Sequence, residues 1–226
     1  MVCFEEMAET KTTSAGALRR QLHSENGFIA VPTTDPEGVN NAVQLGATVF
    51  IDCENDVVPL QRVPNLAERA QNLGGLVIIR TQTAQPSSIA DYIGFHPDGL
   101  VIPSVESGEA CIDLYQAMVN STESTTQPAL IVQIESVAGV ERTREIATSP
   151  GVDAILIGPN DLAASMGLAG QPEHPAVVDA VNQVTEQLGE LKIPFGLPVT
   201  FETIENWRQR GARLFFMLPR HFNRSK

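Results

Sequence analysis

The sequence predicts an α/β protein folded as a (β/α)8 TIM barrel, and two features support this. Short apolar runs alternate with helix-like segments along the chain, as in repeated strand–helix units. The runs are rich in Val, Ile and Leu, as is typical of parallel strands buried on both faces. With 226 residues, the chain is long enough for one barrel domain over residues 1–226. The predicted strands are Phe28–Val31, Thr48–Ile51, Leu76–Ile79, Gly99–Ile102, Ala129–Ile134, Ala154–Ile157 (or from Val152), Phe195–Pro198 and Leu214–Met217.

Helical patterns precede the first strand and separate the others. Pro36 and Pro175 suit first helical turns, and Ser107, Ser136 and His174 are candidate caps. The chain ends soon after the eighth strand, so we expect a reduced C-terminal helix. Trp207 and Phe215–Phe216 are assigned to the core. The predicted helices are Ala15–His23, Pro36–Leu45, Pro64–Leu73, Ser87–Ile93, Ser107–Met118, Gly139–Ala147, Leu162–Met166, Pro175–Leu188 and Phe201–Arg210.

Composition narrows the class of function. The net charge is −12, and so acidic a surface disfavours nucleic acids and anionic membranes as partners. No stretch is long and apolar enough to span a bilayer, and the glutamates near the N-terminus argue against a secretory signal. Cys3, Cys53 and Cys111 show neither zinc-site nor disulfide spacing. We therefore expect a reduced, cytoplasmic protein.

Two of the predicted strands lead into acidic residues. Glu135 follows Ala129–Ile134, and Asp161 closes a Gly-Pro-Asn-Asp turn after Val152–Ile157. The carboxyl ends of parallel strands share one face, where two neighbouring carboxylates repel unless a cation lies between them. Solvated strand-end acids are the alternative, but the pair and its turn favour a divalent metal. Oxygen ligands suit Mg²⁺ or Mn²⁺, with Co²⁺ as a further candidate.

Three charged residues follow the second and third strands at the same predicted face. Arg80 could hold an anionic substrate and stabilise negative charge on its oxygen, or could pair with a neighbouring acid. Asp52 and Glu54 could bind a metal-bound water, and one could act as a base if burial raised its pKa. A polar loop would contain the same acids, so both interpretations stay open.

Two amide side chains complete the candidate site. Gln133 lies two residues before Glu135, so on a strand the two share a face; it binds substrate or fills the barrel. Asn160 precedes Asp161 in a turn whose backbone N–H groups could hold a carboxylate. His23, His96 and His221 have no acidic or nucleophilic context. The sequence contains no Gly-x-Ser-x-Gly elbow, phosphate-binding loop or dinucleotide fingerprint.

In order and content these motifs resemble the metal-dependent 2-keto-acid aldolases. This group includes the hydroxy-oxoheptanedioate and dehydro-deoxyglucarate aldolases and, more distantly, the citrate lyase β subunit. The resemblance covers residues 27–211. The segments that carry it are Val101–Ser107, Gln133–Glu135, Gly151–Gly167 and His174-Pro175. It implies a barrel of the pyruvate/phosphoenolpyruvate-binding type and a homo-oligomer built from dimers, commonly a hexamer.

The resemblance also assigns roles to residues. It implies a divalent metal on Glu135 and Asp161, and a pyruvate carboxylate held by the backbone amides of Asn160 and Asp161. Arg80 matches a substrate-binding arginine, and Asp52 matches the acid of an Asp-x-Glu-His motif. The implied function is a carbon–carbon lyase acting on a pyruvate-like 2-keto acid through a metal-bound enolate. The reaction is aldol cleavage or addition, or decarboxylation of a diacid such as oxaloacetate.

The sequence departs from this family pattern at several places. Asn55 stands where the motif has histidine, Thr81–Gln85 lacks a Trp-Asn-Asp segment, and the loop Ser121–Pro128 is short. An amide cannot act as a general base near neutral pH. Decarboxylation, which needs no base, is therefore one hypothesis. A divergent aldolase using Asp52, Glu54 or metal-bound water as base is another, and a catalytically impaired binding or assembly protein is the third.

Overall fold

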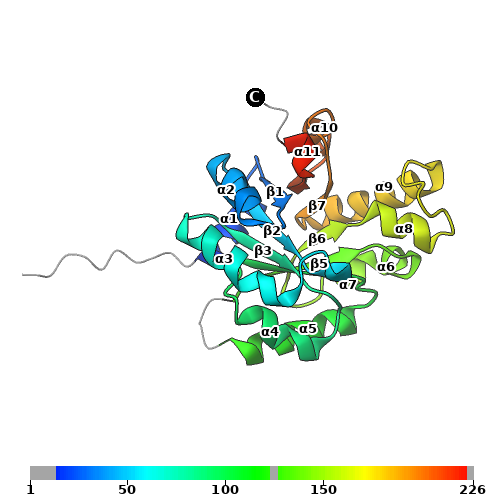
Figure 1. Ribbon diagram of the computed structural model, residues 1–226. Helices are drawn as coiled ribbons and strands as arrows, with labels where there is room; N and C mark the ends of the chain where they lie inside the picture. Colours follow the sequence, from blue (N-terminus) through cyan, green and yellow to red (C-terminus); the bar gives the residue numbers. More distant parts are fainter. Residues whose placement is uncertain (1–13, 123–126, 223–226) are drawn as a thin grey trace, which may run out of the picture.

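A closed parallel barrel forms the centre of the molecule (Figure 1). The computed structural model describes residues 14–122 and 127–222. Each strand pairs with the next in chain order, and the last pairs with the first, as the sequence predicts. Every predicted strand is present, with ends that differ by at most two residues. The strands are β1 Phe28–Pro32, β2 Thr48–Asp52, β3 Val77–Arg80, β4 Gly99–Ile102, β5 Ala129–Ile134, β6 Val152–Ile157, β7 Phe195–Pro198 and β8 Ala212–Phe216.

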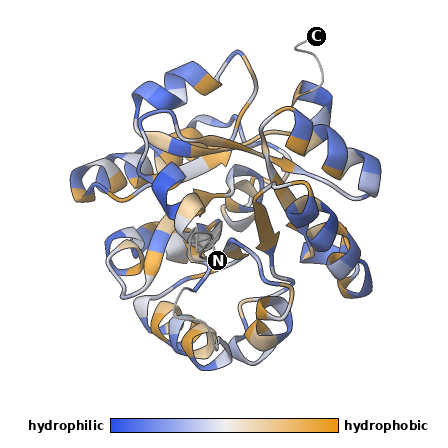
Figure 2. Ribbon diagram, turned by 90° about the vertical axis from the view of Figure 1, so that its left-hand side faces the viewer, coloured by the Kyte–Doolittle hydropathy of each residue, from blue (hydrophilic) through white to orange (hydrophobic). Residues whose placement is uncertain are grey.

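Helices surround the barrel and connect its strands (Figures 1 and 2). The α-helices are α1 Ser14–Leu22, α2 Pro36–Gln44, α3 Val63–Asn72, α4 Ile89–Ile93, α5 Gly108–Ser121, α6 Val137–Glu141, α7 Thr143–Ala147, α8 Pro159–Ser165, α9 Pro175–Leu191, α10 Ile204–Gln209 and α11 Pro219–Phe222. The 3₁₀ helices are η1 Glu54–Asp56, η2 Leu60–Arg62 and η3 Pro86–Ser88.

Helices α5 and α9 end three residues later than predicted, and three other helix predictions need correction. The segment predicted as one helix over Gly139–Ala147 is two, α6 and α7, because Arg142 leaves the helical region with φ −108° and ψ 18°. Helix α8 begins three residues earlier than predicted, at Pro159, since proline suits a first turn. Helix α10 is shorter than the predicted Phe201–Arg210.

Side-chain caps fix the starts of several helices. The predicted caps Ser107, Ser136 and His174 accept hydrogen bonds from the backbone N–H groups of residues 110, 139 and 176, respectively. Asp35 caps α2 in the same way and was not predicted. Each cap satisfies a donor that the first helical turn leaves free.

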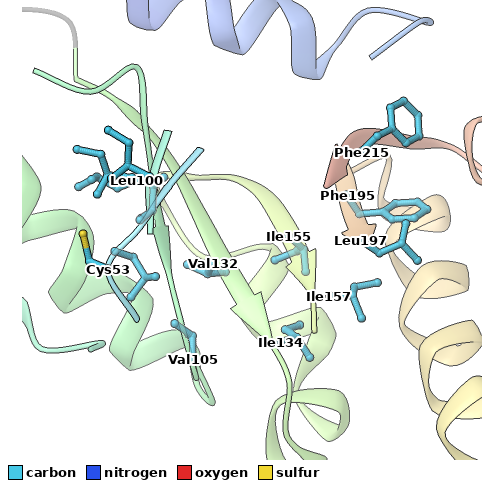
Figure 3. Packing of buried hydrophobic residues seen from close by; sticks show 14 of the residues in the cluster. Cys53, Leu100, Val105, Val132, Ile134, Ile155, Ile157, Phe195, Leu197 and Phe215 are labelled. Carbon is cyan, nitrogen blue, oxygen red and sulfur yellow. The ribbon is translucent and has the colours of Figure 1, made fainter. Parts of the chain in front are cut away.

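Apolar side chains form two shells, one inside the barrel and one between the strands and the helices. Phe50, Ile78, Ile131 and Leu156 belong to the inner shell, and their neighbours along each strand face outward. Figure 2 shows the hydrophobic residues on the strands and on parts of the surrounding helices. Figure 3 shows part of the outer shell, where Phe195 and Leu197 point toward a neighbouring helix.

Helix α1 closes one end of the barrel. Its Leu18 is fully buried in the inner shell, and a Cβ on Gly99 would lie 2.6 Å from Leu18 Cδ2. Arg19 donates two hydrogen bonds to Asp153, at 2.8 and 2.9 Å, and two more to the carbonyls of residues 127 and 128. Glycine at position 99 therefore leaves room for Leu18, and Arg19 ties α1 to β5 and β6.

Some expectations about the rest of the chain fall outside the described residues. These are Cys3, the glutamates near the N-terminus and residues 123–126 of the predicted short loop. Cys53 and Cys111 are free and buried. None of the helices in the described part is long and apolar enough to cross a membrane.

Candidate active site

The inward-facing positions of the barrel change from apolar to polar at the carboxyl ends of the strands. On β2 and β3, the positions two residues after Phe50 and Ile78 are Asp52 and Arg80. On β5, Ile131 is followed in the same way by Gln133 and then by Glu135 just beyond the strand. Because side chains alternate along a strand, these polar groups lie on the inner face, at the end where barrel sites form.

Arg80 stands at the centre of this polar layer. Its guanidinium forms a two-point ion pair with Asp52, at 2.8 and 2.6 Å, and a third contact with Glu54 at 2.8 Å. It also donates to Gln133 Oε1 at 3.3 Å. Burial acts to lower the pKa of Arg80, but the hydrogen bond and charge of Asp52, with Glu54, raise it overall. Arg80 thus stays charged and is held in place by acids on η1 and β2.

Glu135 is buried and held on both of its oxygens. Ser104 donates its backbone N–H and its hydroxyl to Oε1, at 2.8 and 2.9 Å, and Gln133 donates its side-chain amide to Oε2. Burial raises the pKa of Glu135 to about 7, and the nearby Glu54 and Asp161 charges act in the same direction. Ser104 adopts a left-handed φ of 53°, which turns both of its donors to the carboxylate.

A cavity of about 130 Å³ opens above these residues. Its polar lining comes from Arg80, Gln133, Asn160 and Asp161, and its apolar lining from Phe50, Leu156 and Phe216, among others. Gly158 is also part of the wall, and a Cβ there would lie 2.7 Å from Glu135 Oε2. Glycine is therefore needed for the carboxylate to stand where it does.

The structure gathers the predicted site residues at this end of the barrel. Arg80 contacts Asp52, Glu54 and Gln133, and Gln133 also contacts Glu135. Asn160 and Asp161 line the cavity from the first turn of α8. Asn55 follows Glu54, is exposed and has a left-handed φ of 52°.

Sequence reasoning missed two kinds of residue. Ser104 carries no motif of its own, since its role depends on a left-handed backbone that the sequence does not reveal. Trp207 and Phe216 were assigned to the core, but both are only partly buried and line cavities. Both pack against the core clusters, so the core assignment holds for them only in part, whereas Phe215 is fully buried.

The donor set suits a divalent cation. Among residues 14–122 and 127–222, no group of three or more His, Cys, Asp or Glu side chains is placed to coordinate a metal ion. The predicted site uses two, Glu135 and Asp161. Asp52 and Glu54 pair with the one guanidinium, Arg80, while the charges of Glu54 and Asp161 act on Glu135. Burial raises the pKa of Glu54 as well as that of Glu135, so a nearby cation of charge two would stabilise the ionised form of both acids.

Comparison with known proteins adds a family assignment to this geometry. Residues 30–197 match the family described as HpcH/HpaI aldolase/citrate lyase, which is more than half of the chain. The chain belongs to this family. The match covers β2 to β6 entirely, so it includes every predicted site residue from Asp52 to Asp161.

Known aldolases align with parts of the chain. A hydroxypyruvate/pyruvate aldolase of Sagittula stellata is 29% identical over 161 residues, which are 71% of this chain and 55% of the relative. A 4-hydroxy-2-oxo-heptane-1,7-dioate aldolase of Shigella sonnei is 40% identical over 91 residues, 40% of this chain and 35% of the relative. The chain thus spans about half the length of the Sagittula protein and less of the other.

Solved structures of the HpcH/HpaI family share the fold. A family protein from Burkholderia cenocepacia superposes with a TM-score of 0.83 at 19% identity, covering 92% of this chain and 94% of the other. Macrophomate synthase superposes with a TM-score of 0.77 at 21% identity, covering 92% and 85%. The barrel architecture is therefore that of the family.

Proposed function

We propose that this chain is a carbon–carbon lyase that acts with a divalent metal ion on a pyruvate-like 2-keto acid. The observation that carries the proposal is the charge arrangement at the strand ends. One guanidinium, Arg80, is held by two acids, while Glu135 and Asp161, whose charges act on each other, form no ion pair with a described Lys, Arg or His side chain. Membership of an aldolase/citrate lyase family supports the same reaction class.

Each residue has a chemical role in this proposal. Glu135 and Asp161 would hold the ion, which is Mg²⁺ or Mn²⁺ by its oxygen donors, with Co²⁺ as a further candidate. When bound, the cation supplies positive charge that favours an enolate. Arg80 binds the anionic substrate and stabilises negative charge on its oxygen, and Asp52 and Glu54 fix the guanidinium. Gln133, between Arg80 and Glu135, orients the substrate.

The proton chemistry favours decarboxylation. All four histidines lie in the described part of the chain, and none lines the 130 Å³ cavity. In decarboxylation of oxaloacetate, the bond to the departing CO₂ supplies the electron pair of the enolate, so no base has to remove a methyl proton. A proton taken up at carbon then gives pyruvate. Asn55, as the replacement for a basic histidine, fits this reaction.

Aldol chemistry is the second candidate function, and Glu54 is the observation that favours it. Its carboxylate is half-buried beside Arg80, and burial raises its pKa. A carboxylate of raised pKa is a better base, so Glu54 could remove a proton from the pyruvyl methyl group. A catalytically impaired relative that serves as a binding or assembly protein is the third candidate.

Two assays distinguish these functions. With Mn²⁺ present, we expect oxaloacetate decarboxylation, detected as pyruvate, to fall roughly 100-fold in Arg80→Gln. Arg144→Gln, on an exposed surface pair with Glu190, is the matched control and keeps the wild-type rate. Exchange of pyruvate methyl protons in deuterated water measures base activity. Asn55→His should increase that exchange if the rest of the site is competent.

The outcomes are separable. Exchange that is present in the wild type and lost in Glu54→Gln would favour the aldolase. Mn²⁺ binding without either reaction would favour a binding protein and contradict the lyase.

From the family resemblance we also propose a cytoplasmic homo-oligomer built from dimers, up to a hexamer. Light scattering measures the oligomeric state.

A further inference from the structure

A second, larger cavity adjoins the candidate active site. It has a volume of about 410 Å³ and lies between α9, α10, the β7–α10 connection and α11. Pro159, Asn160, Pro198 and Phe216 line both this cavity and the smaller one. Figure 1 shows α10 and α11 beside the ends of β1 and β7, with α8 and α9 on the other side of β7. The two cavities therefore meet at a shared wall.

The lining of the larger cavity is cationic in an acidic protein. Arg210, Arg220 and His221 line it, and Glu173 is its one carboxylate among the described residues. The whole chain has a net charge of −12, so a cavity with more basic than acidic groups runs against the average surface. Local positive charge of this kind attracts anions whatever the net charge of the molecule.

Neither guanidinium is neutralised by the described part of the chain. Arg210 stacks on the Trp207 ring, 4.2 Å from its centroid, and donates to Asn182 and Thr185, at 2.7 and 3.1 Å. Arg220 donates through Nε to the His221 ring at 3.2 Å. None of these partners is a carboxylate, and neither arginine forms an ion pair with a described carboxylate.

We infer that the larger cavity binds the far end of the substrate, and that this end carries an anionic group, a carboxylate or a phosphate, facing Arg220. The inference rests on the proposed function and names the substrate class. A keto acid whose head lies beside Arg80 reaches the second cavity past Asn160 and Pro198. Leu197 and Phe216 supply an apolar wall for the carbon chain, and Arg220, exposed on α11, supplies the counter-charge.

Trp207 makes the inference measurable without catalysis. It is the only tryptophan in the chain, and it lines this cavity. Its fluorescence therefore reports on the cavity alone. The probes are succinate and glycerol phosphate as the two anion types, and 1,4-butanediol as an uncharged molecule of similar length to succinate.

We expect a saturable change of Trp207 emission with at least one anion and none with butanediol. Arg220→Gln should weaken the anion affinity about tenfold, whereas the surface variant Arg144→Gln should leave it unchanged. Comparing the affinities for succinate and for glycerol phosphate shows whether the cavity prefers a carboxylate or a phosphate.

The inference would be overturned by the absence of a saturable response to either anion, by an equal response to butanediol, or by an unchanged anion affinity in Arg220→Gln. An emission that instead depends on protein concentration would assign the cavity to a second copy of the chain, and would overturn it too. Failure here leaves the decarboxylation and exchange assays unaffected, because these measure the Arg80 cluster. Conversely, an anion response without either activity would contradict the proposed reaction and not the anion site.

Discussion

At the scale of single residues, the position of Glu135 depends on its neighbours more than on its own strand. Ser104 holds one oxygen with two donors, and Gln133 holds the other. Gly158 completes the surroundings by having no side chain, since a Cβ at this position would fall inside contact distance of the carboxylate. The Glu135 carboxylate is thus positioned by the backbone conformation at Ser104, the side-chain amide of Gln133 and the missing side chain at Gly158. Each of these three features can be changed by a separate substitution.

Substitution of Gly158 tests this arrangement. In Gly158→Ala the new Cβ would lie 2.7 Å from Glu135 Oε2 and 2.8 Å from Gln133 Nε2, so both side chains must move. If Glu135 is a metal ligand, Mn²⁺ affinity measured by calorimetry should fall roughly 10- to 100-fold, as when other groups that orient a ligand are altered. The fold should be retained, as circular dichroism would show.

The control for this prediction is Gly189→Ala. Gly189 lies inside α9, and a Cβ there has nothing within 4 Å. Alanine in a helix interior is favoured by about 0.5–1 kcal/mol over glycine, so this variant should be as stable as the wild type or more so. It should also bind Mn²⁺ normally. Equal Mn²⁺ affinity in the two variants would contradict the role given to Gly158.

Residue patterns in the sequence were sufficient to place most of the candidate residues at one end of the barrel. Alternation along the strands placed Gln133 on the same face as Glu135, and the acids after Ile51 and Ile157 lie at the carboxyl ends of their strands. Ser104 could not be found this way, because its donors reach Glu135 only through a left-handed turn and the β4–β5 register. The gathering of Arg210 and Arg220 at the second cavity likewise depends on which helices enclose it, and the sequence does not reveal this.

At the scale of elements, strand and helix identity followed from periodicity, but breaks within helices did not. The eight apolar runs are all strands, since continuous Val, Ile and Leu suit a sheet buried on both faces. The division of α6 from α7 at Arg142 has no proline or glycine at that residue to mark it. The caps Ser107, Ser136 and His174 were predictable because a cap is a local interaction, although Ser88 directly precedes α4 without forming one.

Helix α1 gives a prediction at this scale. Arg19→Met removes the two-point pair with Asp153 and the two carbonyl contacts that tie α1 to the barrel. Because the pair is partly exposed, and Asp153 still accepts from the Leu130 N–H, the cost should be on the order of 1–2 kcal/mol of unfolding free energy. Urea denaturation measures it.

The same variant should leave catalysis unchanged, since α1 lies at the opposite end of the barrel from the Arg80 cluster. Arg20→Met is the matched control, because Arg20 is the exposed neighbour of Arg19 on the same helix. Equal stability of the two variants would show that the contacts of Arg19 add nothing to the docking of α1.

At the scale of the whole molecule, the charged groups of the barrel interior are concentrated at one end. The barrel interior is apolar up to the level of Phe50 and Ile131, and acids then gather at one end around a single guanidinium. A compact acidic cluster stabilises the fold only when its charges are compensated. The free energy of unfolding should therefore depend on the protonation of this cluster, and Glu135 is its most buried carboxylate.

The pH dependence of stability follows from Glu135. Its folded-state pKa is about 7, against an ordinary value of 4.5, because burial favours the protonated form. Between these two values the unfolded chain has lost a proton that the folded protein still holds. The unfolding free energy of the metal-free protein should therefore fall as pH rises from about 4.5 to about 7, by on the order of 1 kcal/mol per pH unit.

Comparing variants isolates the contribution of Glu135 from that of other titrating groups. Urea denaturation of metal-free protein at pH 5 and pH 7.5 should show a smaller loss of stability in Glu135→Gln than in the wild type. Glu190→Gln, exposed on α9, should retain the wild-type loss. Adding Mn²⁺ at pH 7.5 should restabilise the wild type, because ligands that bind only the folded state do so by mass action, but not Glu135→Gln. Identical pH slopes in wild type and Glu135→Gln would mean that this carboxyl has the same pKa in the folded and unfolded chain. That result would remove the main support for a metal site at Glu135.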